Sequence, residues 1–264
     1  MSFLPTYLNH LAPVLREDLI RLGRKNDGGY VIPSYVFQQC DALLSLGICD
    51  DWSFDVQFKE HLPEITIHAY DHTTSRRQME REKNSQFRKL FKGKSSWADY
   101  QQKKGLLESY DSFFSLHASH FQERVRSRIE QINDVTIDTI FSRINGQHLF
   151  LKMDIEGDEY RIIDDILRYA SSITALAIEF HHTDHLRMVF LAAIEKLLQH
   201  YEIVHLHANN WGYLATDGLP DVLEITFLDK RLSTGSDRRS ELPIIGLDAP
   251  NNPNRLDYFL KFQR

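Results

Sequence analysis

Long hydrophobic runs are missing from this chain of 264 residues. No stretch approaches the roughly 20 apolar residues that a membrane-spanning helix needs. The first residues also lack the basic head, apolar stretch and small-residue cleavage site of a signal peptide. We therefore expect a cytoplasmic protein without a transmembrane segment. The composition, 42% hydrophobic and 26% charged, is that of a folded chain, and its length suits a single α/β domain.

Cysteine and positive charge are also scarce. The two cysteines, Cys40 and Cys49, are too few for a disulfide framework and lack the spacing of a zinc site, so we expect free thiols. A net charge of −6 argues against a general nucleic-acid binder. Residues 76–94 are the exception, with eight Lys and Arg against two Glu. This segment is either a solvated helix face or a docking face for an anionic substrate such as a nucleotide sugar.

Short apolar runs alternate with helical patterns, as in the βα units of a parallel sheet. Apolar side chains at helical spacing indicate helices over 162–170 and 186–198. The glycine-containing loop before the last apolar run favours a reversal, so the last two strands should be antiparallel. The long polar segment 73–133 is expected to be mostly helical. Six runs are typical of strands: 41–47, 64–70, 148–153, 174–180, 201–206 and 222–228.

Glycine is sparse where the first strand ends. Gly47 stands alone, whereas a dinucleotide-binding turn carries three glycines, which lowers the expectation of a nucleotide-sugar oxidoreductase. Asp71 follows the second strand, 24 residues after Gly47, where an acid accepts hydrogen bonds from ribose hydroxyls. Gly47 and Asp71 together predict a cofactor with a ribose but no pyrophosphate.

Acidic residues and histidines follow two neighbouring strands. Asp154 and Glu156 come after one strand, and Glu179 and His181 stand at the end of the next. Open α/β sheets bind ligands at the carboxyl ends of their strands, so these groups could bind a divalent ion or act as a general base.

Other polar residues have simpler explanations beside functional ones. Asp158 and Glu159 suit the start of a helix, where carboxylates cap it and complement its dipole. Asp27, Gly28, Gly29 and Tyr30 form either a plain turn before a strand or a cover over the amino-acid end of the cofactor. Polar and aromatic residues of the penultimate strand and its loop could line an acceptor pocket, with the tryptophan stacking on a sugar: His205, His207, Asn209, Asn210 and Trp211.

Four segments together resemble one family. Phe150–Tyr160, FLKMDIEGDEY, resembles the signature of the FkbM family of S-adenosylmethionine-dependent methyltransferases. Val135–Ile140 and Ala177–His181 are similar to elements before and after that signature. Arg21–Tyr30 resembles the opening of a branch found with bacterial surface-glycan genes. At the cofactor loop many members have D-x-G-A-x-x-G, whereas this chain has S-L-G-I-C-D-D.

The resemblance implies a fold and a function. The fold is a Rossmann-like class I methyltransferase, one domain over residues 1–264 with a seven-stranded, mostly parallel sheet, a terminal antiparallel hairpin and a helical insertion or lid at about 73–133. The function is S-adenosylmethionine-dependent O-methylation of a carbohydrate or nucleotide-linked sugar in surface glycan biosynthesis. The alternative is a catalytically silent fold that binds a nucleoside or a partner protein; the atypical cofactor loop favours it, and the acids and histidine at the strand ends argue against it.

The expected site combines three groups of residues. We expect Asp154, Glu179 and His181 to be catalytic, and the same three to hold Mg²⁺ or Mn²⁺ if a metal is used, which the resemblance does not require. The expected cofactor contacts are Asp27, Gly28, Gly29, Tyr30, Gly47, Asp50 and Asp71. The expected acceptor contacts are Glu156, His207, Asn209 and Trp211.

Overall fold

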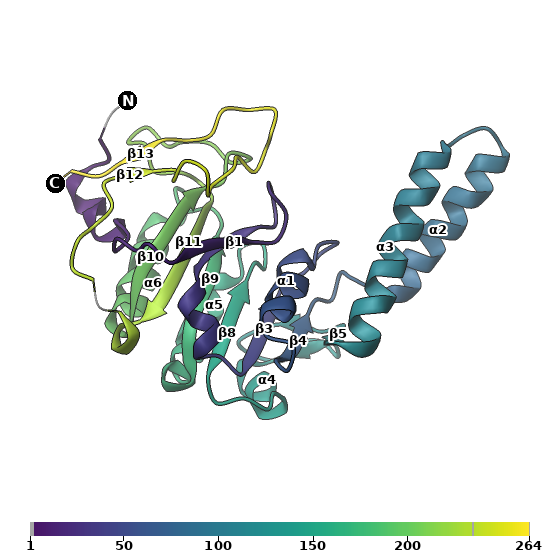
Figure 1. Cartoon of the computed structure of the whole chain (residues 1–264), viewed down its shortest axis with the longest axis horizontal. Helices are drawn as coiled ribbons and strands as arrows, with labels where there is room; N and C mark the ends of the chain where they lie inside the picture. The colour runs from purple at the N-terminus through teal and green to yellow at the C-terminus, as the bar shows by residue number, and fades with distance from the viewer. Residues whose placement is uncertain (1–2, 234, 264) are drawn as a thin grey trace.

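A seven-stranded sheet forms the centre of the computed structural model, which describes residues 3–233 and 235–263 (Figure 1). The strand order is β10-β11-β9-β8-β3-β4-β5. Strand β11 alone runs opposite to the other six strands. It pairs with β10, so the predicted terminal antiparallel hairpin is confirmed. The strands are β3 (Ala42–Leu46), β4 (Thr66–Tyr70), β5 (Ser119–Phe121), β8 (Leu149–Met153), β9 (Ile173–Phe180), β10 (Tyr201–Ala208) and β11 (Leu223–Asp229).

Apolar side chains on both faces of the sheet explain why its central strands are continuous apolar runs. Every residue of β8 and β9 is buried. Along β3, Leu44 and Leu46 pack on one side of the sheet and Leu43 on the other. Helices α4 (Ile137–Arg143), α5 (Glu159–Leu167) and α6 (Arg187–His200) contribute to the first cluster, and α1 (Ser53–His61) contributes to the second.

Shorter elements surround the sheet. Six short strands form three two-stranded sheets: β1 (Leu19–Leu22) with β2 (Tyr30–Pro33), β6 (Arg124–Val125) with β7 (Asp134–Val135), and β12 (Glu241–Leu242) with β13 (Leu260–Lys261). Short 3₁₀ helices lie at Thr6–Leu11, Ser34–Gln38, Ala170–Ser172 and Lys230–Leu232. Both cysteines are free, as predicted.

Helices α2 (Arg76–Phe91) and α3 (Trp97–Leu116) pack on each other as a hairpin that projects from the body (Figure 1). The helical part of segment 73–133 therefore ends at Leu116, earlier than predicted. The chain then forms β5, which extends the sheet beyond β4. Among the described residues, no helix combines the length and the apolar character needed to cross a membrane.

Candidate active site

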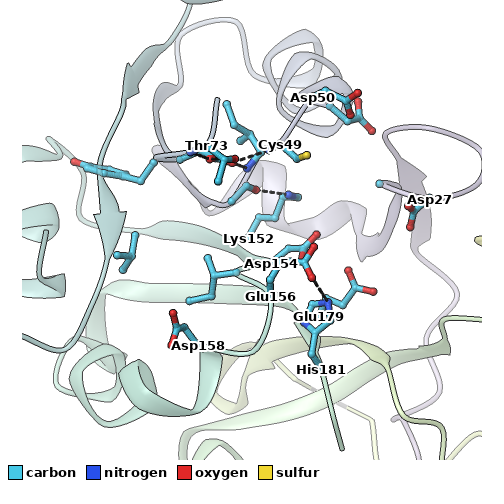
Figure 2. Close-up of a pocket in the computed structure, with 18 of the residues that line it drawn as sticks. Asp27, Cys49, Asp50, Thr73, Lys152, Asp154, Glu156, Asp158, Glu179 and His181 are labelled. Carbon is cyan, nitrogen blue, oxygen red and sulfur yellow. Dashed lines mark hydrogen bonds and ion pairs between the residues drawn. The ribbon is translucent and has the colours of Figure 1, made fainter. Parts of the chain in front are cut away.

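A pocket of about 870 Å³ opens where β3, β4, β8 and β9 end (Figure 2). Its volume lies in the range of small-molecule sites. Eleven of the residues expected from the sequence line it: Asp27, Gly28, Gly47, Asp50, Asp71, Asp154, Glu156, Glu179, His181, Asn209 and Trp211. Gly29, Tyr30 and His207 do not line it.

The wall of the pocket is strongly acidic. Nine carboxylates line it, against three Lys or Arg side chains that each have a partner. Three of the nine carboxylates are themselves paired with arginines: Asp51 with Arg24, Glu123 with Arg143 and Asp158 with Arg126. Arg24 pairs with Asp51 at 3.2 Å, and Arg124 pairs with Asp134. Lys152 Nζ donates to the carbonyl oxygen of Gly47 at 2.9 Å. The pocket therefore attracts a cation and disfavours a phosphate at its inner end.

Gly47 joins two strand ends. Its φ of 84° lies in the left-handed region, and a Cβ there would come within 1.7 Å of the Asp154 carbonyl oxygen. Only glycine fits this close approach. The Gly47 amide donates to the Tyr70 carbonyl, and the Asp154 amide donates to the Leu46 carbonyl. These contacts fix the backbone of Asp154 beside Gly47, and thereby the position of the Asp154 side chain in the pocket.

Asp71 ties two loops together at the pocket wall. Its Oδ2 accepts from the amides of Ile48 at 2.9 Å and Cys49 at 2.7 Å. Its Oδ1 accepts from the amide and hydroxyl of Thr73 and from the amide of Thr74. A carboxylate has about four lone-pair positions, so these five bonds use its capacity. The structure therefore gives Asp71 a loop-clamping role, and its contact with a ribose stays a prediction.

We expect Asp71→Asn to lower the free energy of unfolding by about 2–3 kcal/mol, because an amide cannot accept from both loops. Burial alone would raise the pKa of Asp71, but the bonds from Thr73, Cys49 and Ile48 lower it below its usual value. The stabilisation is therefore present above the ordinary aspartate pKa and is lost as the pH falls through the lowered value. Urea unfolding at neutral and acid pH measures both effects. Asp50→Asn is the control, because Asp50 is an exposed carboxylate of the same loop. Equal stability of the two variants would contradict the clamp.

The Asp27–Tyr30 segment is shaped by packing. A Cβ on Gly28 would lie 2.2 Å from an Asp51 carboxylate oxygen, and one on Gly29 would lie 2.0 Å from the Arg24 carbonyl. Tyr30 is buried, and its hydroxyl donates to Asp154 Oδ2 at 3.4 Å. The expectation that Gly29 and Tyr30 contact the cofactor directly is not met by this geometry, because both lie behind the pocket wall.

His181 and Glu159 form a pair that the sequence did not reveal. His181 Nδ1 lies 3.1 Å from Glu159 Oε1, which also accepts from the amides of Ile155 and Gly157. Glu159 is fully buried. The contact fixes the ring so that Nε2 faces Asp154 and Glu156 across the pocket (Figure 2). The arrangement matches a general base oriented by a carboxylate.

The charge around His181 sets its basicity. Burial opposes the protonated form, but the hydrogen bond and charge of Glu159, with the charges of Asp154 and Glu156, raise the pKa of His181 above its usual value. A base of raised pKa holds an abstracted proton more firmly, and its neutral form is populated above that pKa.

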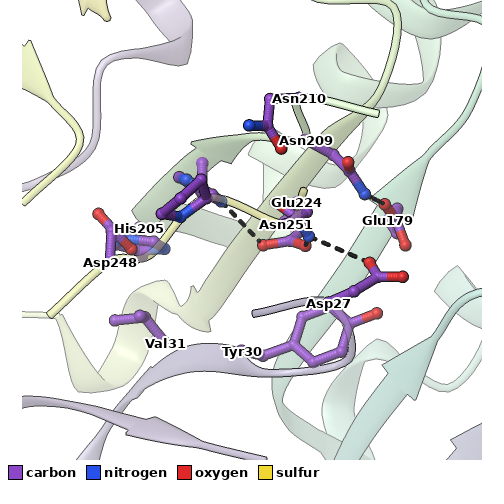
Figure 3. Close-up of polar contacts among 12 residues, drawn as sticks. Asp27, Tyr30, Val31, Glu179, His205, Asn209, Asn210, Glu224, Asp248 and Asn251 are labelled. Carbon is purple, nitrogen blue, oxygen red and sulfur yellow. Dashed lines mark hydrogen bonds and ion pairs between the residues drawn. The ribbon is translucent and has the colours of Figure 1, made fainter. Parts of the chain in front are cut away.

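Glu179 lies deeper, beside a buried polar network (Figure 3). Asn209 Nδ2 donates to Glu179 Oε1 at 2.6 Å, and the two strands place Glu224 directly opposite Glu179. Burial, followed by the charges of Asp154 and Glu224, holds the pKa of Glu179 well above its usual value. Glu179 is therefore more readily protonated than an ordinary glutamate, and its hydrogen bond with Asn209 holds it in the buried network.

His207 belongs to the interior, so the expectation that it lines the acceptor pocket was wrong. Its Nδ1 faces Glu224 at 3.2 Å, and its Nε2 faces Asp257 at 3.1 Å. The neighbouring His205 pairs with Asp248 at 3.0 Å. Burial works against the charged ring, yet Asp257 and Glu224 raise the pKa of His207 to about 10. These pairs hold the C-terminal segment against β10.

One group of potential metal ligands occurs among the described residues, and it differs from the expected one. Ligand atoms of Asp154, Glu156 and His181 lie within 4.8 Å of one another. Glu156 takes the place expected for Glu179, whose Oε1 is bonded to Asn209. Asp154 Oδ1 is buried without a hydrogen-bond partner, and two carboxylates with one imidazole suit Mn²⁺ better than Mg²⁺.

The chain was compared with known families and solved structures. Residues 45–213 match the family model of the methyltransferase FkbM domain. No curated protein matches the chain. A precorrin-6y C5,15-methyltransferase from Geobacter metallireducens shares 12% identity over 75% of this chain and 87% of its own, with a TM-score of 0.38. The N-terminal domain of EvdMO1, solved with SAH and D-fucose, shares 10% identity over 74% of this chain and 78% of its own, with a TM-score of 0.37.

Proposed function

The chain belongs to the FkbM family of S-adenosylmethionine-dependent methyltransferases, and we propose that it methylates a hydroxyl of a carbohydrate or nucleotide-linked sugar in surface glycan biosynthesis. The observation that carries the proposal is the His181–Glu159 pair, which presents Nε2 to the pocket. A hydroxyl acceptor needs such a base, because it must lose a proton when its oxygen is methylated.

The pocket suits the cofactor by charge. S-adenosylmethionine supplies a methyl group already activated by a positively charged sulfur. The carboxylates that line the pocket without an arginine partner, Asp154 and Glu156 among them, favour a cation of this kind, and the buried Asp154 Oδ1 has no hydrogen-bond partner within the protein. The carboxylates of Asp27 and Asp50 line the same wall on the side of the Gly47 loop.

The chain's own residues then divide the work on the acceptor. His181 Nε2 would take the hydroxyl proton as the acceptor oxygen gains the methyl group and the sulfur–carbon bond of the cofactor breaks, and Glu159 would stabilise the resulting imidazolium. Asp154 lies 3.9 Å from the same nitrogen, where its charge favours the protonated ring, while the hydroxyl of Tyr30 holds its other carboxylate oxygen. The protein's contribution is alignment and proton removal.

Carbohydrate specificity rests on the outer pocket. Trp211 is 56% exposed and lines the pocket, so its ring is free to pack on a sugar face. Glu156 offers a carboxylate for sugar hydroxyls, and Asn209, whose amide bonds Glu179 and the Trp211 backbone, holds the Trp211 loop in place. The acidic wall favours a neutral sugar at the inner end, so the phosphates of a nucleotide-linked acceptor would extend outward.

A divalent cation is the second arrangement that these residues permit. Asp154, Glu156 and His181 would hold it, and a bound Mn²⁺ or Mg²⁺ would acidify the acceptor hydroxyl. His181 Nε2 cannot be both ligand and base, so metal dependence separates the two arrangements.

Ligand binding and product analysis test the function. We expect S-adenosylhomocysteine (SAH), the cofactor without its methyl group, to raise the melting temperature, because a ligand that binds only the folded state stabilises it. We expect NAD to have no effect on the melting temperature. Methyl-labelled cofactor should then label free sugars, glycan fragments or nucleotide sugars in preference to a catechol. A shift with NAD but none with SAH would reject the methyltransferase. Binding of SAH with labelling confined to the catechol would reject the carbohydrate acceptor.

A further inference from the structure

The tip of the α2–α3 hairpin, residues 83–98, stands apart from the rest of the fold. Each residue in the range 80–106 is at least partly exposed, whereas Met79, Leu107 and Phe113 near the base are buried. A 16-residue helix such as α2 is about 24 Å long, so the tip lies well away from the sheet (Figure 1). Two helices extended this far gain little from packing on the body, which points to a function at the tip.

Aromatic side chains gather at this tip. The rings of Phe87 and Phe91 lie 4.8 Å apart, and Tyr100 lies 5.3 Å from both Phe87 and Trp97. Holding the hairpin closed accounts for these contacts. It does not account for the exposure of Phe91 and Trp97, which are 78% and 58% exposed. These two side chains leave apolar surface exposed to solvent at the tip of the hairpin.

The charge of the tip is mainly positive: the one acid among residues 83–100 is Asp99, whose carboxylate accepts from the Ser95 hydroxyl and the Ser96 amide. Residues 83–98 hold five Lys or Arg and no Asp or Glu, in a chain whose net charge is −6. Nearer the base three cations have acidic partners: Arg76 pairs with Asp111, Lys103 with Glu82, and Lys104 with Glu108. Among the described residues, no ion pair involves the five tip cations: Lys83, Arg88, Lys89, Lys92 and Lys94. Their charge is therefore available to an external anion.

We propose that the hairpin tip docks on an anionic membrane surface, with Phe91 and Trp97 entering the headgroup region and the lysines meeting acidic lipids. Aromatic side chains favour the membrane interface, and clustered basic residues add attraction to anionic headgroups. The acidic remainder of the chain is repelled by the same surface, which orients the arm toward it. A second copy of the tip is disfavoured as the partner, because it would carry the same positive charge.

The basic segment does not contribute to the inner wall of the active-site pocket. None of residues 76–94 lines the pocket described above. Arg76 and Arg77 line a separate hollow beside Tyr110 and His120, at the base of the hairpin. The docking face for an anionic substrate that the sequence allowed is therefore not at this pocket.

Vesicle binding by the full chain tests the proposal. We expect co-sedimentation with phosphatidylcholine vesicles containing about one third phosphatidylglycerol, and little with pure phosphatidylcholine. Lys89→Glu combined with Lys92→Glu and Lys94→Glu should weaken partitioning by about tenfold or more, since each basic residue contributes near the surface. Phe91→Ser combined with Trp97→Ser should weaken it as well, and about 1 M salt should release the wild type.

Matched controls separate the tip from general stickiness. Met188 and Leu256 are 79% and 90% exposed outside the hairpin, so Met188→Ser combined with Leu256→Ser should bind vesicles like the wild type. All variants should keep the wild-type response to SAH, since the tip lies outside the pocket. Equal binding to both vesicle types, or binding unchanged by the tip variants, would overturn the proposal. Tip-dependent binding of a labelled DNA or RNA duplex without vesicle binding, or tip-dependent dimers, would overturn it in favour of those partners.

Discussion

Replacing His181 with alanine is expected to lower kcat for methyl transfer by about a hundredfold to ten-thousandfold, the range that a general base contributes. The His181 ring lines the pocket, with Nε2 facing Asp154 and Nδ1 held by the buried carboxylate of Glu159. No other imidazole among the described residues combines these contacts. The affinity for SAH should change little, because the base acts on the acceptor. Single-turnover kinetics and calorimetric titration with SAH measure the two effects separately.

The adjacent histidine provides the control. His182 is exposed and has a φ of 57°, a conformation that asparagine tolerates, so His182→Asn removes an imidazole without straining the backbone. We expect this variant to keep nearly full activity. A similar loss in His181→Ala and His182→Asn, or a His181→Ala variant as active as the wild type, would show that His181 is not the base.

Chelation decides how His181 acts. If Nε2 accepts the proton directly, activity should survive exhaustive treatment with EDTA and should not rise with added Mn²⁺ or Mg²⁺. If activity vanishes on chelation and returns with metal, the group of Asp154, Glu156 and His181 is a cation site. Proton removal would then pass to another acceptor, and the loss in His181→Ala would reflect weaker metal binding.

Strand ends were predictable from the sequence because buried parallel strands are marked by continuous apolar runs. The runs at 148–153 and 174–180 end where β8 and β9 end, so Asp154 and His181 were placed at one edge of the sheet. Strand β5 was missed, because three residues are too few to show a period. It lies within a segment whose polar composition resembles that of the preceding helices.

Contacts between distant segments were not predictable. The position of Glu159 at the start of a helix is fully explained by the helix dipole, so nothing local indicates that it reaches His181, 22 residues further on. His207 was misplaced for a similar reason. Its partner Asp257 is 50 residues away, in a C-terminal segment whose path follows no repeating pattern. Burial of His207 depends on that segment.

Glu159→Gln is expected to move the acid limb of the pH profile of kcat/KM to lower pH. Glu159 raises the pKa of His181 by its hydrogen bond and charge. Activity requires the neutral ring, so it rises as the pH increases through that raised pKa. Removing the negative charge lowers the pKa and extends activity into more acid solution. We also expect kcat to fall about tenfold to a hundredfold, because the imidazolium formed during transfer loses its stabilising partner.

The glutamine variant isolates charge from structure. All three hydrogen bonds of Glu159, from Ile155, Gly157 and His181, meet Oε1, and Oε2 has none. An amide oxygen can take the place of Oε1, so the fold and the ring orientation should persist, as the melting temperature would show. Asp158→Asn is the matched control, since Asp158 pairs instead with Arg126 at 2.6 Å and should leave the limb unmoved. A lower kcat with an unshifted limb in Glu159→Gln would mean that Glu159 only supports the fold. A limb that moves in both variants would mean that the general field of the pocket, not this one contact, sets the basicity of His181.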